Sequence, residues 1–188
     1  STTATGDFAA VMAKAARLYK KYDADFADTC LEAALKAYAY MEANAEADEV
    51  GFTNPSDIST GEYPDDHNTD EYIWAAVELY LTTGDSAYLS TIRSLTEKTF
   101  RAGLGWADMG EYAMYDYLKV KGMKEPPVIN SANIPADGSE PVPTEEEIKA
   151  FYDALDDNDY IRIKFSEKMN LFASTALENS TTDPYFSS

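Results

Sequence analysis

Apolar residues recur along most of the chain every three or four positions, which is the spacing of one face of an α-helix. Helices are predicted over residues 7–22, 22–44, 70–81, 86–100, 106–120, 144–155 and 160–177. In the first two helices the predicted buried residues are Phe8, Val11, Met12, Ala15, Ala16 and Tyr19, followed by Phe26, Cys30, Leu31, Ala34, Leu35 and Tyr38. The period-two alternation of a β-strand is nearly absent. The pattern therefore predicts an all-α chain.

Short local signals separate these helices. The sequence TTGD at residues 82–85 is expected to end the third helix. Thr144 stands three residues before Glu147, which is the signature of a capping box at a helix start. Residues 45–69 are predicted to be a loop, and so are residues 121–143, which hold five of the eight prolines.

Two segments of the chain resemble each other. ARLYKKYDADFADTCLEAA and VELYLTTGDSAYLSTIRSL share a Leu-Tyr pair, a break containing Asp, an aromatic residue and a second helix. Tyr19 and Tyr80 are 61 residues apart. Each segment is therefore predicted to be a helical hairpin, and repeated hairpins build either a solenoid or a closed α/α toroid. No strict 34-residue period occurs, and the two long, uneven loops favour the toroid.

Length and charge narrow the functions that the chain can have. With 188 residues, of which 45% are apolar, it is expected to form a single domain over 1–188. The 34 acidic residues outnumber 15 basic ones, for a net charge of −19, which argues against nucleic acid and anionic membranes as partners. No apolar run approaches the ~20 residues of a membrane span. The single cysteine leaves the compartment undecided.

One acidic cluster calls for an explanation. Asp65, Asp66, His67, Asp70 and Glu71 lie within seven residues, and no Lys or Arg occurs between Thr60 and Asp85. The cluster is either a solvated turn with an acidic helix start, the rim of a polar cleft, or an oxygen-lined metal site. Because the ligands are mostly oxygen and no second histidine exists, a hard cation fits better than zinc. On these grounds His67 is interpreted as a solvated loop residue.

Three stretches together resemble glycoside hydrolase family 9, the inverting endoglucanases with an (α/α)6 barrel. They are STTATGDFAAVMAKAARLYKKYDADFADTCLEAALKAY, TGEYPDDHNTDEYIWAAVELYLTTGD and GLGWADMGEYAMYDYL. The resemblance implies part of an (α/α)6 toroid built of antiparallel helical hairpins. It also implies a portion of a secreted, cellulase-type enzyme that hydrolyses β-1,4-glucan with inversion, and a β-glucan or cello-oligosaccharide as substrate.

The family's catalytic motifs do not occur in these residues. Its catalytic base belongs to an Asp-x-Gly-Asp motif, and its proton-donating Glu follows a His-bearing motif; neither is present. Since an inverting glycosidase needs both carboxyl groups, no catalytic residue is assigned. The chain is expected to be an internal portion of a catalytic domain, to need the remainder of that domain as a partner, and to be inactive alone. The alternative is a non-catalytic helical module that binds glycans or another protein.

The resemblance also implies two sets of binding residues. A structural calcium ion would be held by Asp66 and His67, through their backbone carbonyls, and by the side chains of Asp70, Glu71 and Asp108. Tyr63 and Trp106 would lie beside the sugar, where aromatic faces pack on C–H surfaces. Trp74, in the middle of an apolar helix face, is expected to be a core residue instead.

Overall fold

The computed structural model describes residues 1–44, 52–62, 65, 67–101, 105, 107–129, 139 and 141–182. The helices of this part are α1 (Thr2–Tyr19), α2 (Ala24–Ala43), α3 (Thr69–Thr83), α4 (Ala87–Leu95), α5 (Gly110–Lys121), α6 (Glu145–Asp153) and α7 (Asp157–Thr182). The described ranges contain no β-strand, and their β-type pairing is an isolated bridge between Gly105 and Asp108. The all-α prediction is confirmed.

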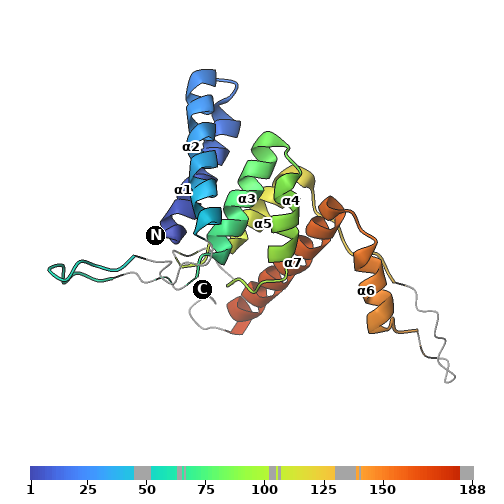
Figure 1. Cartoon of the computed structure of the whole chain (residues 1–188). Helices are drawn as coiled ribbons and strands as arrows, with labels where there is room; N and C mark the ends of the chain where they lie inside the picture. Colours follow the sequence, from blue (N-terminus) through green and yellow to red (C-terminus); the bar gives the residue numbers. More distant parts are fainter. Residues whose placement is uncertain are drawn as a thin grey trace.

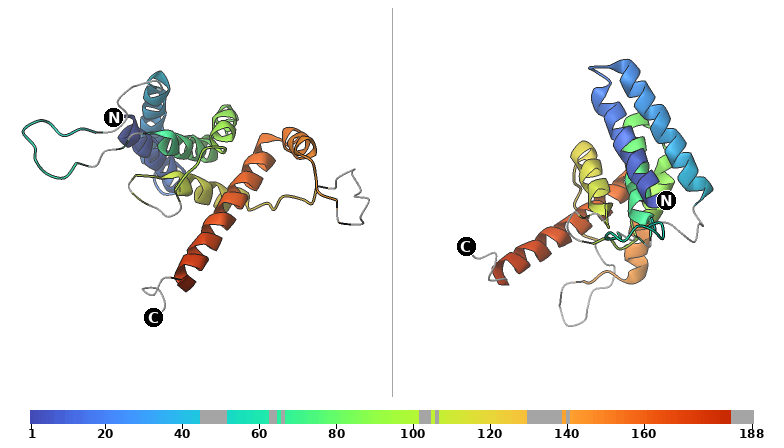
Figure 2. Two further views of the ribbon diagram at one scale, coloured as in Figure 1. Left: turned by 90° about the horizontal axis from the view of Figure 1, so that it is seen from below. Right: turned by 90° about the vertical axis from the view of Figure 1, so that its left-hand side faces the viewer.

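Two antiparallel hairpins form the centre of the molecule (Figure 1). α1 and α2 pack along each other, and α3 packs on α1, α4 and α5. α7 crosses α4 and α5, whereas α6 lies apart from the main body (Figures 1 and 2). The two similar sequence segments are therefore the two hairpins, α1–α2 and α3–α4, as predicted. No helix in the described ranges combines the length and apolar character that crossing a membrane requires.

The buried face of α1 differs from the prediction. Its buried positions are small residues such as Ala9, Ala13 and Ala16, whereas Phe8 and Val11 are 47% and 50% exposed. α2 repeats the pattern, with buried Ala27, Cys30, Ala34 and Ala37 and exposed Phe26 and Leu35. Small residues let helix axes approach closely, because the distance between packed helices depends on the side chains at the contact. The sequence-based choice of the large residues as the core face was wrong for Phe8, Val11, Tyr19, Phe26 and Leu35.

Local signals placed several helix ends well. Gly84 ends α3 with a left-handed backbone, φ 73°, and its N–H donates to the Tyr80 carbonyl. The capping box of α6 is present, with Thr144 and Glu147 exchanging hydrogen bonds. Other ends differ: α1 begins at Thr2 rather than residue 7, α4 stops at Leu95 rather than residue 100, and α5 begins at Gly110 rather than residue 106.

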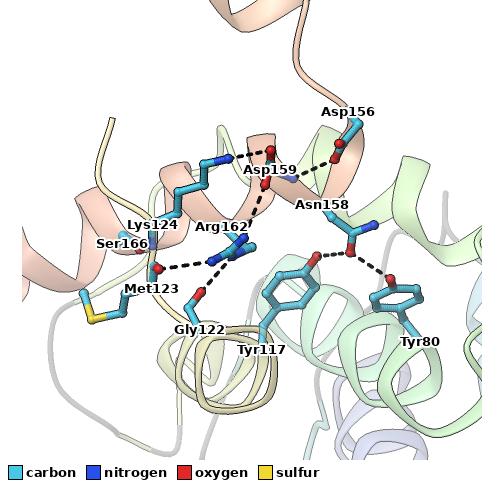
Figure 3. A network of polar contacts seen from close by, with 10 residues as sticks. All are labelled: Tyr80, Tyr117, Gly122, Met123, Lys124, Asp156, Asn158, Asp159, Arg162 and Ser166. Carbon is cyan, nitrogen blue, oxygen red and sulfur yellow. Dashed lines mark hydrogen bonds and ion pairs between the residues drawn. The ribbon is translucent and has the colours of Figure 1, made fainter. Parts of the chain in front are cut away.

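Asn158 fastens α7 to two of the central helices (Figure 3). Its Oδ1 accepts hydrogen bonds from the hydroxyls of Tyr80 on α3, at 2.7 Å, and Tyr117 on α5, at 2.9 Å. Both tyrosines are buried. One amide oxygen therefore satisfies two hydroxyl groups of the core.

The segment after α5 is also held on α7 (Figure 3). Arg162 donates to the carbonyls of Gly122 and Met123, and Lys124 forms an ion pair with Asp159. Residues 122–129 belong to the predicted Pro-rich loop 121–143 and contain no helix. The described start of that loop is thus anchored to the last helix by polar contacts.

Candidate functional site

The acidic cluster lies at the start of α3, where it meets the start of α1. Asn68, which precedes α3, donates from Nδ2 to Oγ1 of Thr2 at 2.9 Å. Asp70 and Glu71 occupy the first turn of α3 and are 0% and 1% exposed. Negative side chains interact favourably with the positive end of a helix dipole, which explains part of their presence here.

Asp70 connects three segments of the chain. Its Oδ2 accepts from the backbone N–H of Met109 at 2.6 Å, and its Oδ1 lies 3.1 Å from Nδ1 of His67. The His67 side chain is exposed, in agreement with its interpretation as a solvated loop histidine. The loop before α5 is therefore fastened to the start of α3 through a buried carboxylate.

Asp108 lies next to this contact, but its carboxylate is used locally. Oδ2 accepts from the N–H of Arg101 at 2.6 Å and Oδ1 from the N–H of Gly110 at 3.0 Å. These bonds close the loop before α5 and satisfy one of the free N–H groups of the helix start. The structure thus brings the Asp108 segment beside Asp70 and gives the Asp108 side chain a role in holding the loop.

Glu71 is the least compensated member of the cluster. Its Oε2 is buried and has no hydrogen-bond partner in the part of the chain that the structure describes. Burial, followed by the nearby Asp70 and Asp65, raises the pKa of Glu71 to about 10. A carboxyl group in such surroundings either keeps a proton or requires a positive partner.

Asp7 on α1 belongs to the same cluster, although its sequence neighbourhood did not single it out. Its Oδ1 is buried and has no hydrogen-bond partner among the described residues. Burial, then Asp70 and Asp65, raises the pKa of Asp7 to about 6. Asp7 is 63 positions before Asp70, so only the packing of α1 on α3 reveals that the two carboxyl groups are neighbours.

Some of the predicted metal ligands, namely His67, Asp70 and the segment of Asp108, lie close together at the start of α3. Among the described residues, no three His, Cys, Asp or Glu side chains converge closely enough to hold a metal ion. His67 and Asp70 line a cavity of about 150 Å³ together with Lys98, which brings positive charge from outside the acidic stretch. A cation would offset the charge of these carboxyl groups when they are ionised, and the calcium assignment stays a prediction. Asp66, and the predicted sugar-contacting residues Tyr63 and Trp106, lie outside the described residues.

Trp74 is a core residue, as predicted. It is 7% exposed, and its ring stacks on that of Tyr112 with the centroids 5.1 Å apart. It contributes to the contact between α3 and α5 rather than to a binding surface.

A second set of buried charges lies farther along α3. Glu78 is 0% exposed and lies 2.6 Å from Nη1 of Arg17 and 3.7 Å from Nζ of Lys14. Lys14 also pairs with Asp116 of α5 at 2.5 Å. These four side chains, called the Glu78 cluster below, join α1, α3 and α5. Sequence periodicity did not indicate them, because Glu78 occurs in an otherwise apolar run.

The pKa values of the two acids in the Glu78 cluster move apart. Burial, then the nearby carboxyl group of Asp116, raises the pKa of Glu78 to about 7. Burial would also raise that of Asp116, but the nearby Glu78 and the hydrogen bond from Lys14 outweigh it and lower the pKa of Asp116. The pair therefore favours one proton, carried by Glu78.

Two relatives of this chain are named as endo-acting glucanases. A 35% identical relative over 63% of this chain is "Endoglucanase D" of Acetivibrio thermocellus, and a 37% identical one, also over 63%, is "Xyloglucan-specific endo-beta-1,4-glucanase BoGH9A" of Bacteroides ovatus. The chain spans about a fifth of the length of each, 19% and 21%.

Solved structures show the same likeness. A family 9 glycoside hydrolase of Bacteroides ovatus matches 99% of this chain with 30% of its own, at a TM-score of 0.64 and 27% identity. AaCel9A, in complex with a cellobiose-like isofagomine, matches 63% of this chain with 22% of its own, at a TM-score of 0.58 and 40% identity. The prediction of part of an (α/α)6 toroid is confirmed.

The sequence model described as "Glycosyl hydrolase family 9" matches residues 1–176, which is nearly the whole chain. This range includes both hairpins, the acidic start of α3 and most of α7. The chain therefore belongs to glycosyl hydrolase family 9.

Proposed function

We propose that this chain is part of the catalytic domain of a secreted, cellulase-type glycoside hydrolase that cleaves β-1,4-glucan with inversion. The observation that carries the proposal is α3, whose buried acidic start, WAAVELY run and Gly84 stop are placed together at the centre of the fold. Relatives that are named endoglucanases support β-glucan or cello-oligosaccharides as substrates.

The buried carboxylates at the start of α3 suit a scaffold better than the chemical step. An inverting glycosidase places a general acid and a general base about 6.5–9.5 Å apart, across the scissile bond from each other. Asp70 and Asp108 instead accept hydrogen bonds from backbone N–H groups of the loop before α5. We therefore assign the catalytic pair to the remainder of the domain. In this proposal, Tyr63 and Trp106 contact the sugar rings.

The activity of the chain tests this assignment. The purified 188-residue chain should release no reducing sugar from carboxymethylcellulose or from mixed-linkage β-glucan. A chimera in which it replaces the corresponding segment of the Bacteroides ovatus family 9 structure should regain hydrolysis. Turnover by the isolated chain would place the catalytic pair within these residues, whereas a folded but inactive chimera would favour a non-catalytic glycan- or protein-binding module.

The proposal includes a structural calcium ion at the start of α3. Its ligands would be the carboxylates of Asp70, Glu71 and Asp108 and the backbone carbonyls near Asp66 and His67, because calcium prefers six to eight oxygen atoms. The buried, unpartnered Oε2 of Glu71 supports a cation at this place. When bound, the ion supplies positive charge to the cluster.

Thermal unfolding with and without calcium tests the ion. The melting temperature should rise with free calcium and fall with a chelator, since a ligand that binds the folded state stabilises it. Asp70→Ala should abolish most of the calcium-dependent gain. Asp65→Ala should change it little. If the unchanged chain shows no response to calcium, the carboxylates serve only as a helix start.

A further inference from the structure

Asp7 is placed beside the acidic start of α3 by the packing of α1 on α3. Gly6, the preceding residue, is so close to α3 that a Cβ atom built on it would lie 2.6 Å from Cβ of Glu71. The contact between Asn68 and Thr2 holds the starts of the same two helices together. The side chain of Asp7 therefore begins beside the first turn of α3, on a helix that cannot easily move away.

One carboxyl oxygen of Asp7 has no hydrogen-bond partner among the described residues. This oxygen, Oδ1, is buried, and so is the unpartnered Oε2 of Glu71, whose side chain is 1% exposed. Asp65 differs, since it accepts a hydrogen bond from the backbone of His67. Two unpartnered carboxyl oxygens, on α1 and α3, thus lie near the same carboxylate, that of Asp70.

We infer that Asp7 is a further carboxylate of the cation site, so that a bound calcium ion fastens the start of α1 to the start of α3. This inference rests on the calcium ion proposed above and adds a residue from a separate helix. Carboxylates that carry like charges repel one another, and no three His, Cys, Asp or Glu side chains of the described residues converge on one point. A divalent cation reverses this repulsion and draws them together.

The inference predicts opposite effects of one substitution in two conditions. Asp7→Asn keeps the shape of the side chain but removes its charge. With chelator present, the variant should melt at the same or a higher temperature than the unchanged chain, because repulsion of Asp70 and Asp65 is relieved. With calcium, its stabilisation should be clearly smaller, and its Kd for calcium should be weaker by about tenfold or more.

Isothermal titration with calcium chloride and thermal unfolding in chelator or calcium would measure both effects on the 188-residue chain. Asp7→Glu, which retains the charge, should keep most of the calcium response. Asp25→Asn, an exposed acid in the first turn of α2, is the matched control and should leave the calcium Kd unchanged.

The outcomes separate this inference from the proposal on which it rests. A calcium response that is equal in the unchanged chain and in Asp7→Asn would overturn the role of Asp7 and leave the ion at α3 intact. The absence of any response in the unchanged chain would overturn both the ion and the role of Asp7. Neither result would affect the glucanase proposal, which the chimera tests separately.

Discussion

Single carboxyl groups in this chain differ widely in their surroundings, although they look alike in the sequence. Glu32 lies on the surface beside Lys36, with which it forms an i,i+4 ion pair. Glu78 is fully buried between α1 and α5. The desolvation that distinguishes them depends on neighbours that are distant in the sequence. A buried acid of this kind links the stability of the fold to pH.

Replacement of Glu78 tests that link. Its pKa is raised from 4.5 to about 7, so between these values the folded chain binds more protons than the unfolded one, and stability falls as pH rises. Glu78→Gln keeps the shape of the side chain and removes the titration. The free energy of unfolding of the variant, relative to that of the unchanged chain, should therefore rise between pH 5 and pH 8, by roughly 3 kcal/mol at most.

Urea unfolding at pH 5 and pH 8 would measure the gain. Glu32→Gln is the control, because this group is exposed and its hydrogen bond with Lys36 lowers its pKa rather than raising it. An unchanged difference between Glu78→Gln and the parent chain at the two pH values would show that Glu78 holds no extra proton.

Among whole helices, local signals predicted some of the ends, and tertiary contacts decided the faces. The Thr144–Glu147 capping box and the Gly84 stop each depend on a few neighbouring residues, so they could be recognised in the sequence. The buried face of α1 could not be recognised in the sequence, because apolar residues lie on two sides of this helix. The side with small residues is the one that packs against the partner helices. The place of Asp7 beside Glu71 likewise depends on that packing.

The attachment of α7 illustrates a helix contact that depends on polar groups. Asn158 accepts from the hydroxyls of Tyr80 and Tyr117, and the latter is fully buried. Asn158→Ala should remove the acceptor of both hydroxyls and lower the free energy of unfolding by about 2 kcal/mol. Chemical denaturation would measure this loss.

Asn158→Asp is the matched variant for that contact. A carboxylate oxygen can accept from the same two hydroxyls, and the position lies in the first turn of α7, where negative charge is favourable. Its stability should therefore stay close to that of the unchanged chain. Equal losses in the two variants would mean that the amide packs in this place without serving as an acceptor.

At the scale of the molecule, α1 shows that the described fold is part of a larger packing unit. Its small-residue face, with Ala9 and Ala13, is buried against neighbouring helices. Phe8, Val11 and Leu18 recur at helical spacing on the opposite side and are 47%, 50% and 55% exposed. A run of large apolar side chains on an exposed helix face marks a surface that another element can cover. In the family's barrel, further helices would cover this face.

The exposed face of α1 should make the chain associate with itself when no other helices cover it. Large apolar patches on a soluble protein mark places where another surface binds. Sedimentation velocity should therefore show association that increases with protein concentration. The triple change Phe8→Ser, Val11→Ser and Leu18→Ser should shift the chain toward the monomer and leave the far-UV spectrum unchanged, because these side chains lie outside the described core.

The control is the double change Val128→Ser and Leu171→Ser, at two exposed apolar positions elsewhere, and it should not change the association. If the triple variant associates as strongly as the parent chain, a surface other than this face of α1 is responsible.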